Sequence, residues 1–273
     1  NGFTYSCWSK APTVHPYLIA TRTNRGTEEE STSRTPMQRR GVDEVRAALE
    51  NEVVNLILVQ KDCPSSAVKE LLQKAHSKGI PVREGAESDL WRMAIPAPDA
   101  PLILALVGRA IDADLEQVLA SDSVVWMLCG VRYAVNIGYV IRTAEISGAA
   151  GVIICGEFTK TEQKTALRAS MQTDRFIPVF WSSTTKALEA ISNSGRRLVS
   201  VEDVGTVMPW ESDVKGNPVI CVGGEHDGIP EQVISASDQV IRLPMAGFVP
   251  SYNLQTAMGV VAIEAMKQNN LGK

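Results

Sequence analysis

Three short segments carry residue types that could together bind a small molecule and act on it. Residues 136–144 contain Asn136, Gly138 and Arg142 at intervals of two and four residues. The other segments are the glycine-rich residues 223–230 and residues 243–253. Both follow short β-branched runs and lead into helical patterns, which places them as loops at the carboxyl ends of strands. Open α/β sheets bind ligands at such loops.

These segments resemble the three motifs of the SpoU (TrmH-type) RNA 2′-O-ribose methyltransferases, a family of the SPOUT superfamily. The family motifs read N-x-G-x-x-x-R-[ST]-A, then G-x-E-x-x-G, then [IL]-P-M followed by S-x-N, and all three occur here in that order. The similar stretch covers residues 122–268. A simple sheet-edge turn explains either loop alone, but it explains the ordered set of three motifs poorly.

The resemblance implies transfer of a methyl group from S-adenosylmethionine (SAM) to a ribose 2′-hydroxyl. Arg142 would bind the adjacent phosphate and stabilise the developing alkoxide, because an arginine stays protonated and is a poor base. Asn136 and Arg142 are both expected near the start of one helix, with Gly138 leaving room at its first turn. Glu225 would hold backbone N–H groups or Asn136. The candidate catalytic residues are Asn136, Arg142, Glu225, Ser251 and Asn253.

The resemblance also implies that main-chain atoms hold SAM, since glycines let the backbone approach a ligand closely. Tyr252 replaces the leucine that is usual in the third motif, which would alter the shape of the adenine pocket. Ser251 and Asn253 could orient the ribose, brace the loop or cap the last helix. The candidate cofactor-binding residues are Gly223, Gly224, Gly228, Leu243, Met245 and Tyr252.

The residues before the first motif depart from the family pattern. The family has L-D-G-V-x-D-P-x-N, whereas residues 128–136 read L-C-G-V-R-Y-A-V-N, without either acid or the proline. Tyr133 then becomes available to stack on a nucleotide. Arg168 begins a segment similar to one in which the family's arginine meets RNA, with Gln172 in place of the usual glycine. The candidate RNA-binding residues are Arg34, Arg39, Arg40, Arg132, Arg142 and Arg168.

Composition favours a globular protein with reduced cysteines. Of the 273 residues 44% are hydrophobic, and no apolar run reaches the roughly 18 residues of a spanning helix. The five cysteines form no C-x-x-C pair, which is typical of reduced thiols in a cytoplasmic protein. The three histidines lack metal-ligand spacing, so no metal is expected. The net charge of −4 weighs weakly against RNA binding, although residues 1–40 alone carry +3.

The first 121 residues are predicted to form three segments. Residues 1–40 are polar and basic and predict either a loosely ordered tail or an RNA-contacting arm. Residues 41–95 predict an α-β-α-β unit with a helix cap at Ser65 or Ser66, similar to the ribosomal-protein-like RNA-binding domain that often precedes the family's catalytic domain. Residues 96–121 predict a proline-marked linker followed by a helix over residues 102–119.

Residues 122–273 predict the SAM-binding methyltransferase domain. Strands alternate with helices, and this order indicates a mainly parallel sheet covered on both faces. The strands are expected at residues 124–128, 151–155, 177–180, 197–201, 219–222 and 239–243, with a final helix over residues 254–267. No G-x-G-x-x-G follows the first strand, which argues against an ordinary dinucleotide-binding domain. The resemblance implies the C-terminal trefoil knot of SPOUT enzymes.

The leading hypothesis is therefore a homodimeric SAM-dependent RNA 2′-O-methyltransferase acting on tRNA or rRNA. The apolar side of the final helix suits a dimer interface and an ordinary core helix equally. One alternative is a non-catalytic RNA-binding relative that keeps the fold; another is a nucleotide-binding oxidoreductase. The target nucleotide, and the choice between a housekeeping and an antibiotic-resistance role, stay open. The apolar side comprises Leu254, Ala257, Met258, Val261, Ala262 and Ala265.

Overall fold

The chain forms two separate β-sheets. The computed structural model describes residues 37–94, 99–249 and 251–271. The predictions for residues 1–36, Arg34 included, and for the proline-marked residues 95–98 lie outside the described residues. Among the helices of the described ranges, none is long and apolar enough to cross a membrane.

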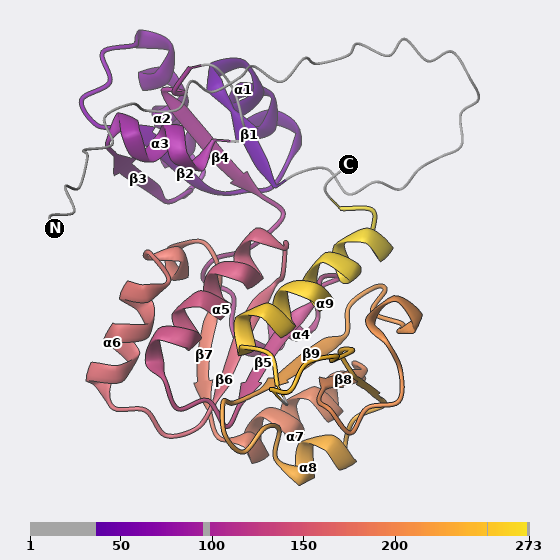
Figure 1. Ribbon diagram of the computed structural model, residues 1–273. Helices are drawn as coiled ribbons and strands as arrows, with labels where there is room; N and C mark the ends of the chain where they lie inside the picture. Colours follow the sequence, from indigo (N-terminus) through magenta and orange to yellow (C-terminus); the bar gives the residue numbers. More distant parts are fainter. Residues whose placement is uncertain (1–36, 95–98, 250, 272–273) are drawn as a thin grey trace, which may run out of the picture. The chain divides into compact units, whose positions relative to one another are not determined.

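The first sheet has four strands in the order β1-β4-β2-β3 (Figure 1). Its elements are β1 (Gln38–Arg40), α1 (Gly41–Asn51), β2 (Val54–Gln60), α2 (Ser66–Ser77), β3 (Val82–Gly85), α3 (Glu87–Met93) and β4 (Ile103–Val107). Helices α1 and α2 pack on one face, and α3 places Leu90 against Leu58 and Leu104. Ser65 caps α2 by accepting a hydrogen bond from the N–H of Val68, as predicted.

Two predictions for this region are wrong. Residues 38–40 are not loosely ordered, because they pair with β4, and Arg39 forms an ion pair with Glu52 at 2.6 Å. Residues 102–119 are not one helix, because they contain β4 and the short helix α4 (Leu115–Leu119). A short apolar run such as Ile103–Val107 fits a buried strand or a buried helix equally by pattern. Pairing with β1 and β2, which is non-local, makes it a strand.

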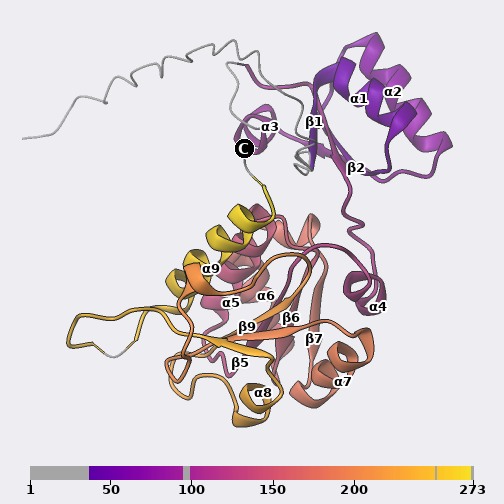
Figure 2. The same ribbon diagram turned by 90° about the vertical axis from the view of Figure 1, so that its right-hand side faces the viewer.

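The second sheet has six strands, and every neighbouring pair is parallel, as predicted (Figure 2). The strand order is β10-β8-β9-β5-β6-β7. The strands are β5 (Val125–Cys129), β6 (Gly151–Cys155), β7 (Val179–Ser182), β8 (Leu198–Val201), β9 (Val219–Gly223) and β10 (Gln239–Ile241). The strand expected at residues 177–180 begins two residues later, as β7.

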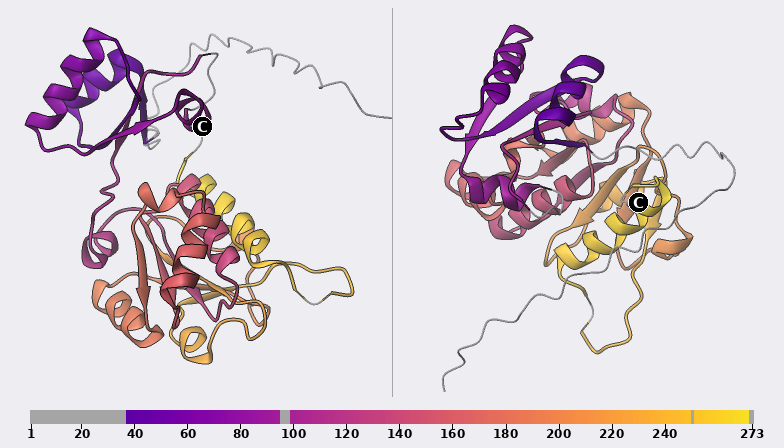
Figure 3. Two further views of the ribbon diagram at one scale, coloured as in Figure 1. Left: turned by 90° about the vertical axis from the view of Figure 1, so that its left-hand side faces the viewer. Right: turned by 90° about the horizontal axis from the view of Figure 1, so that it is seen from above.

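Helices cover both faces of this sheet (Figure 3). On one face lie α5 (Ala134–Ile146), α6 (Lys160–Ala169) and α9 (Leu254–Gln268); on the other lie α4, α7 (Thr184–Ser194) and α8 (Glu231–Ser235). Side chains along β5 alternate between the two faces of the sheet. Trp126 and Leu128 enter the core beneath α5, α6 and α9, whereas Met127 and Cys129 enter the core beneath α4, α7 and α8.

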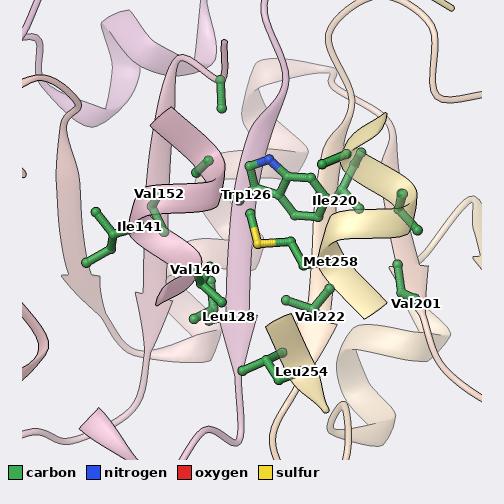
Figure 4. Close-up of a cluster of buried hydrophobic side chains, with 14 of the residues drawn as sticks. Trp126, Leu128, Val140, Ile141, Val152, Val201, Ile220, Val222, Leu254 and Met258 are labelled. Atoms are coloured by element: carbon green, nitrogen blue, oxygen red, sulfur yellow. The ribbon is translucent and has the colours of Figure 1, made fainter. Parts of the chain in front are cut away.

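The apolar side of α9 belongs to the core. Leu254 and Met258 lie beside Trp126 and Val222 (Figure 4), and Val261, Ala262 and Ala265 are buried with them. Of the two sequence alternatives for this side, the core helix is the correct one. Val260 and Ile263 are the exposed apolar side chains of α9.

The cysteines of the described residues are free thiols, as predicted. Cys129, Cys155 and Cys221 are buried on adjacent strands, and Cys63 is half-buried. Cys7 lies outside the described residues.

Candidate cofactor and active site

The loops after β5, β8, β9 and β10 lie at the carboxyl edge of the parallel sheet, at the lower end of the domain in Figure 1. Parallel strands all end at the same edge, so the second and third motifs and the residues before Asn136 come together there.

Glycines in two of these loops permit backbone-to-backbone contact. A Cβ atom on Gly224 would lie 1.7 Å from the carbonyl oxygen of Gly130, and one on Gly223 would lie 2.6 Å from the carbonyl carbon of Gly228. From the sequence, these glycines are expected to let a ligand approach closely. The structure gives them a further role: Gly224 lets the loop after β9 pack against the loop after β5, and Gly223 lets the loop after β9 fold back on itself.

A polar network joins the first motif to the second. The side-chain amide of Asn136 donates to Oε1 of Glu225, and the backbone N–H of Arg132 donates to Oε2 at 3.1 Å. The expected contacts of Glu225 are therefore present. Beside them the exposed Arg132 pairs with Asp227 at 2.5 Å, and the Tyr133 hydroxyl lies 3.5 Å from Nε2 of His226. Glu225 thus fixes the amide of Asn136 at the first turn of α5.

Helix α5 separates the two predicted catalytic residues of the first motif. Asn136 is in the first turn, but Arg142 lies six residues further along, a rise of about 9 Å. The prediction that both lie near the start of the helix is wrong for Arg142. Gly138 serves a different purpose from the one expected. A Cβ atom there would lie 2.4 Å from the carbonyl oxygen of Ala166, so the glycine lets α5 approach α6 closely.

Arg142 meets a turn that the motifs did not include. Its Nη1 lies 3.1 Å from Sδ of Met171, just beyond the end of α6. Met171 and Gln172 both adopt left-handed backbone conformations, with φ of 58° and 61°. Gln172 occupies the position where the family has glycine, which adopts this conformation freely. The absent glycine is the sequence signal that could have drawn attention to Met171.

The loop after β10 presents main chain at the sheet edge. Leu243 turns its side chain into the core, whereas Met245 and Ser251 are exposed. The hydroxyl of Tyr252 donates to the carbonyl of Pro244 at 2.8 Å and so ties the two ends of the loop together. Asn253 caps α9 by accepting the N–H of Gln255 at 2.9 Å, which is one of the roles expected for it.

Sequence reasoning missed one acid at this edge. Glu202 directly follows β8, and its Oε2 accepts the N–H of Ile229 at 2.8 Å. Its carboxylate lies 2.5 Å from where a Cβ of Gly228 would stand, and Gly228 has a φ of 63°. Glu202 belongs to no motif. The sequence feature that could have identified it is its position directly after a predicted strand.

The structure thus joins some predicted site residues and leaves others apart. Asn136, Glu225 and Arg132 form one network, whereas no hydrogen bond among the described residues joins Arg142 or Ser251 to it. Arg168 is exposed in the last turn of α6. Arg39 and Arg40 belong to the other sheet.

Comparison with known proteins assigns the class that this fold and site define. Residues 123–263 match the SpoU rRNA Methylase family, and the chain belongs to that family. This membership sets aside the oxidoreductase alternative.

Curated relatives match across most of the chain. The chain is 25% identical over 238 residues to the 23S rRNA (guanosine-2′-O-)-methyltransferase RlmB of Xanthomonas axonopodis pv. citri, covering 84% of this chain and 95% of that protein. It is 29% identical over 234 residues to a protein of Staphylococcus saprophyticus assigned to the TrmH family of tRNA/rRNA methyltransferases, covering 82% and 92%.

Solved structures show the same fold. The SpoU methyltransferase AviRb of Streptomyces viridochromogenes, in complex with AdoMet, is 22% identical with a TM-score of 0.53, covering 86% of this chain and 91% of that one. An AdoMet-bound rRNA methyltransferase of Sinorhizobium meliloti is 24% identical, also with a TM-score of 0.53, covering 85% and 87%.

Proposed function

We propose that this protein is a SAM-dependent RNA methyltransferase that methylates a ribose 2′-hydroxyl of tRNA or rRNA. The observation that carries the proposal is the family match, which spans all three motifs. The names of the curated relatives add support: one acts on the guanosine 2′-O position of 23S rRNA, and another is assigned to tRNA/rRNA methylation.

The loops at the carboxyl edge fit SAM as a ligand held by main-chain atoms. Because the side chain of Leu243 is buried, this residue offers its backbone at the edge. The Tyr252–Pro244 hydrogen bond holds the following loop in shape. We assign the main chains of Gly223, Leu243 and Tyr252 to the cofactor, with Gly224, Gly228 and Met245 shaping the surrounding loops. SAM, when bound, supplies the electrophilic methyl group.

The chain's own residues would bind and orient the ribose. The exposed guanidinium of Arg142 has the donors to bind a phosphate bidentately and to stabilise negative charge on the 2′-oxygen. The hydroxyl proton then passes to phosphate or water, since Arg142 stays protonated. Asn136, fixed by Glu225, offers its amide as a second polar group for the substrate. Ser251 is exposed and free to contact the ribose.

A homodimer accounts for the distance between Arg142 and the cofactor loops. Val135, Tyr139 and Ile146 are exposed on α5, and Val260 and Ile263 are exposed on α9. These two helices lie side by side (Figure 1), and exposed apolar patches mark interaction surfaces. We propose that a second copy packs here and brings its own loop after β10 to Arg142.

The trefoil knot belongs to the same proposal. The segment after β8 runs alongside the end of β10, since Val207 pairs with Ile241 and its carbonyl accepts the N–H of Arg242 at 2.8 Å. A Cβ on Gly205 would lie 2.7 Å from the carbonyl carbon of Ile241. This close packing supports a threaded C-terminal segment.

The first sheet is assigned to RNA binding, and the protein to the cytoplasm. The unit from β1 to β4 would be the ribosomal-protein-like RNA-binding domain, with Arg40 and Arg39 as contacts. An RNA substrate and free thiols favour the cytoplasm.

Two measurements on the unaltered protein and Arg142→Ala test the function. Calorimetric titration with SAM reads the cofactor site, and transfer of labelled methyl groups to total RNA from cells lacking the protein reads catalysis. We expect Arg142→Ala to keep its SAM affinity within about twofold while turnover falls by about 10²–10³-fold, the usual effect of removing a preorganised charge stabiliser. Binding of SAM without methyl transfer to any RNA would instead favour the non-catalytic relative.

A further inference from the structure

A row of three cations runs along one side of α6. Lys160, Lys164 and Arg168 are spaced four residues apart, so they share one side of the helix, and all three are exposed. The row is about 12 Å long at 1.5 Å per residue. Of the three, Arg168 alone lies in a segment that the family resemblance singles out.

The three charges are not used inside the protein. In the part of the chain that the structure describes, none of them forms an ion pair. The nearby acid Glu162 is occupied, because its Oε2 accepts both the backbone N–H and the hydroxyl of Thr159 at 2.8 and 2.7 Å. A row of unpaired cations is distinctive on a chain whose net charge is −4.

Helix stability does not explain the row either. Lys160 is the first residue of α6, where the helix dipole disfavours a positive charge and favours an anion. Arg168 in the last turn interacts favourably with the helix dipole, whereas Lys160 in the first turn interacts unfavourably with it. A ligand that brings negative charge to this side would remove the conflict.

The Arg168 end of the row lies near Arg142. Helix α6 ends at Ala169, and two residues later Sδ of Met171 contacts Nη1 of Arg142 at 3.1 Å. The contact of Gly138 with Ala166 and Ala169 holds α5 against this end of α6. Arg142 therefore lies beside the same end of α6 as Arg168.

We propose that Lys160, Lys164 and Arg168 bind successive phosphates of the RNA backbone and guide the strand to Arg142. The inference rests on the proposed function, which makes RNA the substrate. Cations strung along a helix suit a polymer with regularly repeated charges, whereas a single small anion would need donors that converge on one point. The contacts are to phosphates, so they position the RNA without reading its sequence.

The salt dependence of RNA binding tests this surface. The double variant Lys160→Gln/Lys164→Gln is compared with the unaltered protein and with Lys186→Gln, an exposed lysine of α7 on the opposite face of the sheet. The probe is a fluorescein-labelled single-stranded oligouridylate, read by anisotropy without SAM between about 50 and 200 mM salt. The logarithm of the RNA-binding constant falls linearly with the logarithm of the salt concentration, and each phosphate contact contributes about 0.7 to the steepness of this fall. The slope of the double variant should therefore be shallower by about 1.4.

The outcomes separate this inference from the proposed function. A double-variant slope equal to that of Lys186→Gln, or failure of the unaltered protein to bind the probe at about 50 mM salt, would overturn the phosphate row. A reduced slope in a protein that methylates no RNA would keep the row and overturn the methyltransferase. Urea unfolding, compared with that of the unaltered protein, checks that the double variant is folded.

Discussion

Gly224 lies against Gly130 so closely that a Cβ atom on Gly224 would stand 1.7 Å from the carbonyl oxygen of Gly130. The two residues belong to different loops at the same edge of the sheet. This contact therefore fixes the position of the second motif relative to the residues that precede the first motif.

Gly224→Ala should force these loops apart. We expect the free energy of unfolding to fall by about 1–3 kcal/mol, the usual cost of overpacking, and SAM affinity to fall at least tenfold if the adjoining main chain holds the cofactor. Gly247→Ala is the matched control, because a Cβ there meets nothing within 4 Å. Urea unfolding and calorimetry measure both effects. SAM affinity within twofold of the unaltered protein would show that the loop contact does not shape the cofactor site.

The hydrogen bond between Asn136 and Glu225 should appear as a coupling energy. A double-mutant cycle with Asn136→Ala and Glu225→Ala should give about 1–3 kcal/mol in urea unfolding, because the acceptor is ionised and the pair is partly buried. The neighbouring Arg132–Asp227 pair is exposed and should couple by less than about 1 kcal/mol. Equal coupling in the two cycles would contradict the structural role of Glu225.

Gln172→Gly should stabilise the protein. A left-handed conformation at a non-glycine residue destabilises the folded state by about 1–2 kcal/mol. Glycine also raises the entropy of the unfolded chain, but the stability lost in this way is smaller than the strain relieved. We expect the free energy of unfolding to rise by about 0.5–1 kcal/mol, measured by urea unfolding. Glu189→Gly, inside α7, should instead destabilise by about 0.5–1 kcal/mol. A loss of stability in Gln172→Gly would mean that this turn is not left-handed.

The buried thiols should make stability fall in alkaline solution. Hydrogen bonding to the Cys129 thiol, and then burial, raise the pKa of the Cys155 thiol well above its ordinary value. The folded protein thus keeps a proton that the unfolded chain releases above about pH 8.5, so this stabilisation is complete below that pH and is lost as the pH rises. Each such thiol should lower the free energy of unfolding by about 1.4 kcal/mol per pH unit.

Urea unfolding of the unaltered protein and Cys155→Ala at pH 7.5 and 9.5 checks this expectation. The variant should be less stable at the lower pH but should lose less stability between the two. Parallel losses in both proteins would show that the Cys155 thiol titrates alike in the folded and unfolded chains.

Local pattern predicted much of the parallel domain. The buried runs that became β5, β6, β8 and β9 lie within a residue or two of their expected positions, because a strand covered on both faces must be continuously apolar. The caps at Ser65 and Asn253 were also readable, since capping needs only the side chain and the next few N–H groups. The motif order indicated the family before any geometry was known.

Other features depend on residues far apart in the chain. The run at β4 is a strand because it pairs with β1 and β2, and pattern alone does not contain that pairing. The purpose of Gly138 depends on α6, and the left-handed turn that meets Arg142 depends on how α6 ends.

The sequence by itself determined the chemistry available at the candidate site: an amide, a guanidinium, a carboxylate and two loops rich in glycine. Only the tertiary structure decided their partners. Asn136 meets Glu225 across 89 residues, and Arg142 meets Met171 across 29. Parallel strands carry loops from distant positions to a common edge, and side-chain contacts there form only when the whole sheet has assembled.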